Sequence, residues 1–351
     1  MSKLDELIAE LCPDGVEYKN LKEICGTITT GKLNANAMVE NGKYAFFTCD
    51  ATPFRIDSYA FDTEAILVSG NGSQVGHINY YKGKFNAYQR TYVLSNFNYT
   101  DVKYLLHYLK GYLRDYIMAH SKKGSVPYIT LPMLQNFKIP IPPLPVQNEI
   151  VRILDNFTEL TAELTAELTA RRKQYEYYRD LLLTDLNEDT VKWISLKECT
   201  LPTSNIKWSL EDESTTYKYI DLTSVDRELH YITETQEINK NNAPSRAQQI
   251  VKAGDILFAT TRPLLKRYCL IDSEYDGQIC STGFCVLMAN TDIVLQKWVL
   301  YHIASSSFYY HVEKYQQGAS YPAISDTNVK DYRIPVPPIE EQERIVAILD
   351  R

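Results

Sequence analysis

The chain lacks the marks of a membrane, secreted or metal-binding protein. No run of its 351 residues approaches the eighteen or more apolar residues of a membrane span, and the acidic, amphipathic start does not resemble a signal peptide. The seven cysteines are odd in number and include no Cys-x-x-Cys pair, and the six histidines are scattered without metal-ligand spacing. Cys280 and Cys285 lie in an apolar run and are expected to be buried. We therefore expect a cytoplasmic chain without a metal site.

A catalytic constellation is also missing. Residues 13–19 superficially match the Pro-Asp…Glu-x-Lys pattern of metal-dependent nucleases, but two intervening residues are too few to form the hairpin that this chemistry needs. Pro142-Pro143 and Pro337-Pro338 lack the amide acceptor and the aromatic residue of an adenine methyltransferase loop. The glycine-rich residues 70–76 lack the Gly-Lys-Ser/Thr ending of a phosphate loop. These absences predict a binding protein that is not an enzyme and holds no cofactor.

Charge is unevenly distributed along the chain. The formal net charge of −7 argues weakly against nucleic-acid binding. However, residues 13–145 contain 14 basic and 10 acidic side chains, whereas residues 187–339 are net acidic. Because local charge determines contact, basic patches on an acidic chain still permit DNA binding.

An internal repeat with a constant offset of 195 is present. Residues 138–144, KIPIPPL, reappear as residues 333–339, RIPVPPI, and Gln147 and Asp155 reappear as Gln342 and Asp350. Earlier landmarks recur in the same order at slightly different offsets, and only the middle of each half diverges. This pattern predicts two related modules, each of which recognises a different target.

Local patterns predict that each module is α+β. Short strand-like runs between turn signals extend to about residue 98 in the first half and to about residue 290 in the second. A helix is expected over residues 2–11 and 101–119, and a single helix over about 292–316.

A long helix is predicted over residues 146–186, which contain no Pro or Gly and are rich in Leu, Ala, Glu and Arg. At 1.5 Å per residue, its length would be roughly 60 Å. Leu160, Leu164 and Leu168 form a stripe within a Thr-Ala-Glu-Leu tandem. This stripe indicates a helix that packs on another helix, a rigid spacer, or both. Arg171, Arg172 and nearby Tyr175 indicate a solvated face or a surface for DNA or a partner.

The combination resembles the specificity subunits of type I restriction-modification systems. The resemblance rests on the doubled proline segment that leads into Gln147…Asp155, its copy at Gln342…Asp350, the opening residues 4–16 and the Thr-Ala-Glu-Leu tandem. It implies an α+β fold with two related target recognition domains separated by a long, coiled-coil-like spacer helix. The implied divisions are an N-terminal helix (1–12), target recognition domain 1 (13–145), the spacer helix or conserved region 1 (146–186), target recognition domain 2 (187–339) and the start of a truncated conserved helix 2 (340–351).

The resemblance also implies partners. Such subunits bind a bipartite double-stranded DNA target, and two methyltransferase subunits dock on the long helices and methylate adenine. Restriction subunits complete the complex, and S-adenosylmethionine, ATP and Mg belong to these partners, so no cofactor and no membrane contact are expected for this chain. The expected spacer and methyltransferase-docking residues are Leu160, Leu164, Leu168, Arg171, Arg172 and Tyr175.

Basic and aromatic residues in each half are candidates for DNA contact, because base edges are read by side chains and phosphates bind cations. A solvated surface charge is the alternative for each. The candidates in the first half are Lys82, Lys84, Tyr88, Arg90, Lys122, Lys123 and Ser125. The candidates in the second half are Arg262, Lys266, Arg267, Tyr268, Ser320 and Tyr321.

The sequence departs from the family pattern at its end. The second long helix should follow Asp350, where the sequence has only Arg351. Two alternatives to DNA recognition remain at this point: a scaffold that binds proteins, or an inactive truncated copy that recombines with other copies. Neither alternative predicts a salt-sensitive affinity for DNA.

Overall fold

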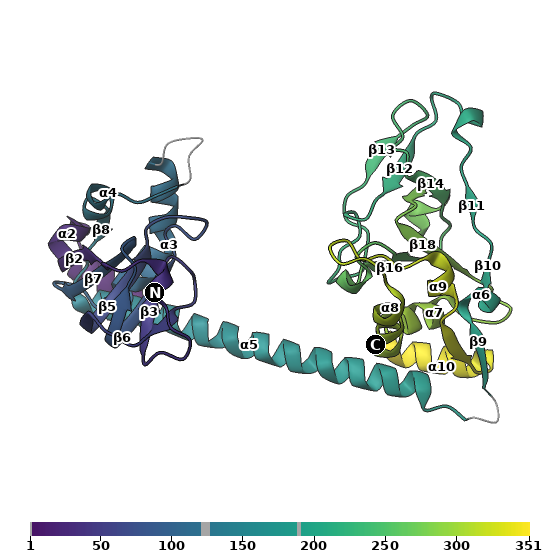
Figure 1. Ribbon diagram of the computed structural model, residues 1–351. Coiled ribbons are helices and arrows are strands. Elements are labelled where there is room, and N and C mark those ends of the chain that lie inside the picture. The colour runs from purple at the N-terminus through teal and green to yellow at the C-terminus, as the bar shows by residue number, and fades with distance from the viewer. Residues whose placement is uncertain (1, 121–126, 188–190) are drawn as a thin grey trace. The chain divides into compact units, whose positions relative to one another are not determined.

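The computed structural model describes residues 2–120, 127–187 and 191–351 (Figure 1). It divides into two compact units, unit 1 (Met1–Thr165) and unit 2 (Ala166–Arg351). Each unit combines β-sheets with helices, as the sequence predicts. Helix α5 (Leu144–Thr184) is continuous across the division between the units. It begins and ends two residues earlier than expected.

Unit 1 is built on a sheet with the described strand order β2-β7-β5-β6-β3-β4. Its strands are β2 (Cys25–Thr30), β3 (Tyr44–Phe47), β4 (Phe54–Ile56), β5 (Phe61–Ser69), β6 (Ile78–Ala87) and β7 (Thr91–Phe97). A separate pair joins β1 (Tyr18–Asn20) to β8 (Lys138–Pro140). The helices are α1 (Lys3–Leu11), α2 (Leu21–Ile24), α3 (Val102–His120), α4 (Leu131–Gln135) and the 3-10 turn η1 (Ala35–Ala37).

Strand β5 buries both of its faces, because alternate side chains point to opposite sides of a sheet. On one side, Ile66 packs with the apolar stripe of α3, which includes Leu105 and Leu109. On the other side, Leu67 packs in a second cluster with Phe85. Each fully buried side chain of this size contributes about 1.5–3 kcal/mol relative to an exposed one. The short apolar run of β5 therefore fixes the centre of the sheet.

Unit 2 has two main sheets, of four and five described strands, where unit 1 has one sheet of six. Their described orders are β10-β18-β15-β16 and β11-β14-β17-β12-β13. The strands are β10 (Thr200–Leu201), β11 (Ser204–Asn205), β12 (Tyr217–Ile220), β13 (Gln236–Ile238), β14 (Ala247–Ile250), β15 (Ile256–Ala259), β16 (Tyr268–Leu270), β17 (Ile279–Ser281) and β18 (Phe284–Ala289). Strand β9 (Lys192–Ser195) pairs separately with β19 (Arg333–Val336).

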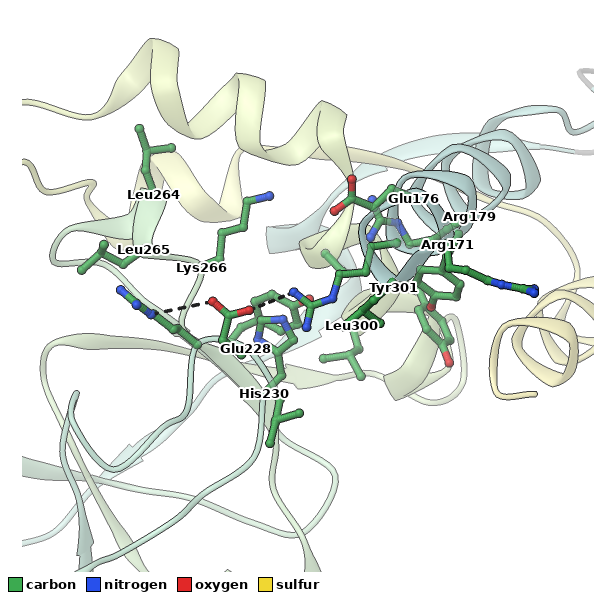
Figure 2. Close-up of a pocket in the computed structure, with 17 residues that line it drawn as sticks. Arg171, Glu176, Arg179, Glu228, His230, Leu264, Leu265, Lys266, Leu300 and Tyr301 are labelled. Atoms are coloured by element: carbon green, nitrogen blue, oxygen red, sulfur yellow. Dashed lines mark hydrogen bonds and ion pairs between the residues drawn. The ribbon is translucent and has the colours of Figure 1, made fainter. Parts of the chain in front are cut away.

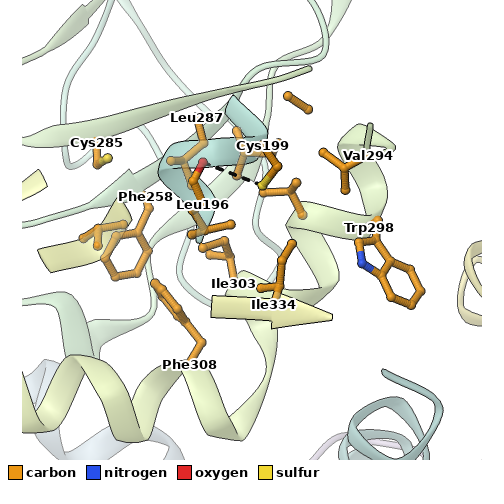
Figure 3. Packing of buried hydrophobic residues seen from close by; sticks show 14 of the residues in the cluster. Leu196, Cys199, Phe258, Cys285, Leu287, Val294, Trp298, Ile303, Phe308 and Ile334 are labelled. Carbon is orange, nitrogen blue, oxygen red and sulfur yellow. Dashed lines mark hydrogen bonds between the residues drawn. The ribbon is translucent and has the colours of Figure 1, made fainter. Parts of the chain in front are cut away.

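The helices of unit 2 cover the first of these sheets. They are α6 (Leu196–Cys199), α7 (Gln296–Ala304), α8 (Ser306–Tyr315), α9 (Asp326–Lys330) and α10 (Ile339–Leu349), with 3-10 turns η2 (Trp208–Leu210), η3 (Pro263–Leu265) and η4 (Ser273–Tyr275). Figure 3 shows the core between helices and sheet, where Phe258 of β15 faces Phe308 of α8. Cys285 lies in this core and Cys280 in a neighbouring cluster. Both are free and buried, as expected.

The repeat seen in the sequence corresponds to the same backbone bonds in each unit. Gln147 is fully buried, accepts a bond from Asp101 N at 2.8 Å and donates to Pro142 O at 2.7 Å. Its counterpart Gln342 accepts from Leu295 N at 2.9 Å and donates to Pro337 O at 2.9 Å. Gln147 therefore joins the start of α5 to the residues before α3, and Gln342 joins the start of α10 to the residues before α7.

One predicted element is wrong. The single helix expected over about 292–316 is two helices, α7 and α8, which meet at Ser305. Ser305 is extended (φ −70°, ψ 154°), and its hydroxyl accepts a bond from Phe308 N. A serine that caps a new helix stabilises a break in a long apolar pattern, which periodicity alone does not reveal.

Helix α5 is exposed along its middle. Leu160, Leu164 and Leu168 are 50–57% exposed. The threonines of the tandem bond back to the helix; for example, Thr161 donates to Phe157 O at 2.7 Å. Such i−4 bonds satisfy the hydroxyl without a tertiary partner. The leucine stripe is thus an open apolar face on a regular helix.

Candidate nucleic-acid interface

A set of three backbone segments meets at the end of β5 in unit 1. Gly70 N donates to Arg90 O at 2.8 Å, and Ile129 N donates to Gly70 O at 2.8 Å. A side chain at residue 70 would overlap the carbonyl oxygen of Arg90, so this close approach requires glycine. We call the three segments around Gly70, Arg90 and Ile129 the strand-end frame of unit 1.

The strand-end frame recurs in unit 2 at the end of β15. Thr260 N donates to Gly283 O at 2.8 Å, and Ile324 N donates to Thr260 O at 2.9 Å. The next residues also pair alike: Asn71 bridges to Tyr128 in unit 1, and Thr261 bridges to Ala323 in unit 2. The two units therefore hold the same backbone arrangement with different side chains.

In unit 1 the frame borders a hollow of about 360 Å³. Arg90 and Gln89 line this hollow together with Tyr128, which is 46% exposed. The neighbouring candidate Tyr88 is half-buried, and its backbone N donates to Phe47 O. Among the first-half contact candidates that the structure describes, Arg90 is thus the one that the frame presents to solvent beside an aromatic ring.

The other candidates of the first half lie elsewhere. Lys82 and Lys84 are on β6 and do not line the hollow. Lys82 Nζ is 3.9 Å from Glu64, and Lys84 Nζ lies over the Tyr59 ring, 4.7 Å from its centroid. Their role in DNA contact stays a prediction. Lys122, Lys123 and Ser125 lie outside the described residues.

In unit 2 the frame presents Arg262 and Tyr321. The Arg262 guanidinium lies 4.4 Å from the centroid of the Tyr321 ring, and this ring is 71% exposed. Arg262 N donates to Pro322 O at 2.7 Å, which joins the two segments. Ser320 is exposed beside them. An exposed cation over an aromatic face offers both a hydrogen-bonding fork and a stacking surface.

Arg267 and Tyr268 are held by unit 2 itself. Arg267 Nη1 donates to Leu222 O at 2.7 Å and to Val225 O at 3.1 Å. Tyr268 stacks on His230 with ring centroids 3.9 Å apart, and burial raises the pKa of Tyr268 to about 12. The same burial lowers the pKa of His230, since the charged form loses water. These contacts give both candidates a structural role, and direct DNA contact stays a prediction.

A groove of about 900 Å³ in unit 2 brings together residues that the sequence assigned to separate roles (Figure 2). Helix α5 contributes Leu168, Arg171, Arg172 and Tyr175 to it, and the loop after β15 contributes Lys266. Leu160 and Leu164 do not line the groove.

Charges in the groove are partly paired. Arg172 Nη1 is 2.9 Å from Glu228, which ties α5 to the loop before β13, and Arg171 pairs with Glu167 on its own helix. Both pairs are exposed and therefore contribute little to stability. Lys266 forms no ion pair with another described residue and lies over the ring of Tyr309. The groove is thus basic and amphipathic, and it combines exposed cations with apolar walls.

Sequence reasoning missed Tyr128, Glu228 and His230. Tyr128 directly follows Pro127, shortly after Lys122 and Lys123, and this proximity was an available signal. Glu228 and His230 lie in an acidic loop that carried no signal for a groove. Within the described ranges, no cluster of three or more metal-ligating side chains occurs, and no described helix is both long and apolar enough to cross a bilayer.

The fold and the doubled strand-end frame define a class of protein built from two related domains joined through a long helix. The family model for the type I restriction modification DNA specificity domain matches residues 13–171 and again residues 194–351. The chain belongs to this family.

Relatives agree over most of the chain. The Escherichia coli type I restriction enzyme EcoDI specificity subunit is 26% identical, and the match covers 91% of this chain and 77% of that protein. A putative type I restriction enzyme specificity subunit of Haemophilus influenzae is 28% identical, and the match covers 96% of this chain and 87% of that protein. The crystal structure of a type I restriction-modification S subunit from M. genitalium has a TM-score of 0.50 at 16% identity and covers 95% of this chain and 90% of that one. This last likeness shows the shared fold.

Proposed function

We propose that this chain is the DNA-specificity subunit of a type I restriction-modification complex and that its two units read the two halves of a bipartite DNA target. The observation that carries the proposal is the strand-end frame, which occurs twice with different exposed side chains. A fixed backbone with exchangeable side chains suits a reader of two unrelated half-sites.

The contacts divide into two kinds. Base edges in the grooves carry the sequence, whereas phosphates fix position without reading it. Arg90, Arg262 and Tyr321 are exposed on the frame and suit base contact. Lys266, Arg171 and Lys84 suit phosphate contact, although they lie away from the frame bonds. The acidic net charge of −7 favours a complex in which partner subunits supply more positive charge.

Helix α5 is the proposed platform for partners. Its open stripe of Leu160, Leu164 and Leu168 offers apolar surface to methyltransferase subunits, and restriction subunits join that complex. In this proposal the partners bind S-adenosylmethionine, ATP and Mg and perform the chemistry, while this chain supplies recognition. Its seven free cysteines suit the reducing cytoplasm in which such a complex meets DNA.

The experiment that tests the proposal is a methylome of cells that express this chain together with its methyltransferase subunit. We expect methylated adenines in one bipartite motif. Purified complex should also bind a duplex that carries this motif with an affinity that falls steeply with salt, with a slope of about −0.9 in log K per phosphate contacted. A soluble complex that leaves no methylated motif and binds DNA without salt dependence would refute the proposal.

A further inference from the structure

One backbone position of the strand-end frame is left-handed in both units. In unit 1 it is Gly72, with φ 85°, and in unit 2 it is Arg262, with φ 48°. Glycine adopts positive φ at little cost, whereas a long side chain adopts it only when the surroundings enforce it. Arginine at a position that is glycine in the sister unit is therefore a strained choice. Such strain is a recognised mark of a functional site.

A second position shows the reverse exchange. Arg90 in unit 1 corresponds to Gly283 in unit 2, because each carbonyl accepts the bond from the residue that ends the frame strand. An added Cβ at Gly283 would lie 3.1 Å from the Leu222 side chain. Any side chain at this position therefore requires the Leu222 side chain to shift, whereas the other segment leaves the Arg262 side chain exposed.

Each arginine has a tyrosine beside it on the third segment. Tyr128 lines the same hollow as Arg90, and Tyr321 lies under the guanidinium of Arg262. By the offset of 195, Tyr128 corresponds to Ala323, which is two residues after Tyr321. Positions two apart on an extended segment face the same way. Both units thus supply one exposed arginine and one exposed tyrosine from different positions of one frame.

We propose that Arg90 and Arg262 are the equivalent base-reading residues of the two units and that each recognises a guanine in its half-site. Arginine forms a bidentate pair with guanine O6 and N7, which is the commonest specific contact in the major groove. Both side chains are exposed, and neither guanidinium bonds to another described residue, so the forks are free to pair. This inference rests on the proposed DNA-specificity function.

The test in unit 2 is Arg262→Gly in the full chain, co-expressed with its methyltransferase subunit. The substitution restores the residue that unit 1 uses at this left-handed position, so folding is preserved. We expect the preference for guanine at one position of one half-site to fall roughly 5- to 150-fold in a randomised methylation substrate. The other half-site should stay unchanged.

The matched control is Lys266→Gly, which removes an exposed cation from a left-handed position (φ 55°) of the same loop. It should weaken binding about equally for all sequences and leave base preferences intact. If Lys266→Gly relaxes the same guanine as Arg262→Gly, the loop as a whole determines preference and the assignment to Arg262 is overturned.

The test in unit 1 is Arg90→Ala, with Arg114→Ala on α3 as its control. Arg114 is an exposed arginine of the same unit that does not line the hollow. Arg90→Ala should relax one guanine in the half-site that Arg262→Gly leaves intact, and Arg114→Ala should relax none. Relaxation of both half-sites, of neither, or of a base other than guanine would overturn the inference.

The wild type and the variants test the two proposals separately. If the wild-type complex methylates no bipartite motif, the proposed DNA-specificity function is wrong. If the wild-type complex has a motif but the arginine variants keep every base preference, only the assignment of Arg90 and Arg262 is wrong.

Discussion

His302 is the most strongly perturbed histidine among the described residues. It is buried beside Trp298 in α7, and its Nε2 has no hydrogen-bond partner. Burial lowers its pKa from an ordinary 6.5 to about 3; to a smaller extent, the negative charge of Asp180 raises this pKa and the positive charge of Arg179 lowers it. The folded chain therefore keeps this imidazole neutral at a pH where the unfolded chain binds a proton.

This shift predicts acid sensitivity of unit 2. Above pH 6.5 the side chain is neutral in both states and contributes no pH dependence. Below pH 6.5 only the unfolded state binds the proton, so the free energy of unfolding should fall by about 1.4 kcal/mol per pH unit. Urea unfolding between pH 7.5 and 5, followed by tryptophan fluorescence, should show this slope for the wild type and a shallower slope for His302→Leu.

The control is Val299→Ala. Val299 is a buried, non-titrating neighbour in α7, so its replacement should lower the free energy of unfolding at every pH and leave the slope in place. Equal slopes for wild type and His302→Leu would mean that other groups cause the acid sensitivity.

At the scale of single residues, the sequence shows which basic and aromatic residues are candidates for contact, but it does not show whether each side chain is exposed or packed inward. Arg90 and Arg262 were predicted as contact residues from their position in basic, aromatic runs. Arg267 and Tyr268, from the same run as Arg262, turn inward to carbonyls and a histidine ring. Neighbouring cations look alike in a sequence, because the turn that separates them depends on backbone φ values. The left-handed Arg262 and Lys266 are a case of this kind.

At the scale of elements, helix length was predictable and helix interruption was not. The absence of Pro and Gly after Pro145 predicted α5 closely, and the apolar stripe of α3 predicted that helix to within one residue at each end. The break at Ser305 escaped because Leu300 and Phe308 continue an apolar pattern on both sides. Three consecutive serines at residues 305–307 were the available signal for a cap.

The tandem in α5 makes a length prediction at this scale. Deleting Thr161–Leu164 removes four exposed residues, shortens the helix by about 6 Å and rotates its downstream part by about 40°. We expect the methylome motif to keep both half-sites and to change its spacer by one or two base pairs. The change results from rise and rotation, because the deleted residues touch no core.

A substitution control separates length from composition. Replacing the same four residues with Ala-Ala-Gln-Leu keeps the rise, the rotation and the docking leucine Leu164, and should keep the spacer. An unchanged spacer after the deletion, with both half-sites still read, would rule out α5 as the element that sets spacing.

For the whole molecule, the repeat predicted what the units share and could not predict where they differ. The constant offset matched Gln147 with Gln342 and the segment of β8 with that of β19, and the structure gives each matched pair the same contacts. The strands that pair with β8 and β19 are β1 and β9, which match each other at a different offset. The unmatched middles hold one large sheet in unit 1 and two in unit 2. A divergent segment offers no internal comparison, and pairing between strands distant in sequence is not encoded in local periodicity.

Separate cores predict separate unfolding. The buried clusters around Leu105 and Phe85 belong to unit 1, and the cluster around Phe258 belongs to unit 2. The chain has three tryptophans, at positions 193, 208 and 298, and all lie in unit 2. Tryptophan fluorescence therefore reports on unit 2, whereas far-UV circular dichroism reports on both units.

The two buried glutamines test this separation. Gln147→Ala leaves Asp101 N and Pro142 O without their partner, and we expect a loss of about 2–4 kcal/mol of unfolding free energy in unit 1. This loss should split the circular dichroism transition and leave the tryptophan midpoint in place. Gln342→Ala should lower the tryptophan midpoint, because it removes the same bonds from unit 2, and the exposed control Gln74→Ala should change neither signal. A tryptophan midpoint that falls equally for Gln147→Ala and Gln342→Ala would mean that the two units unfold as one.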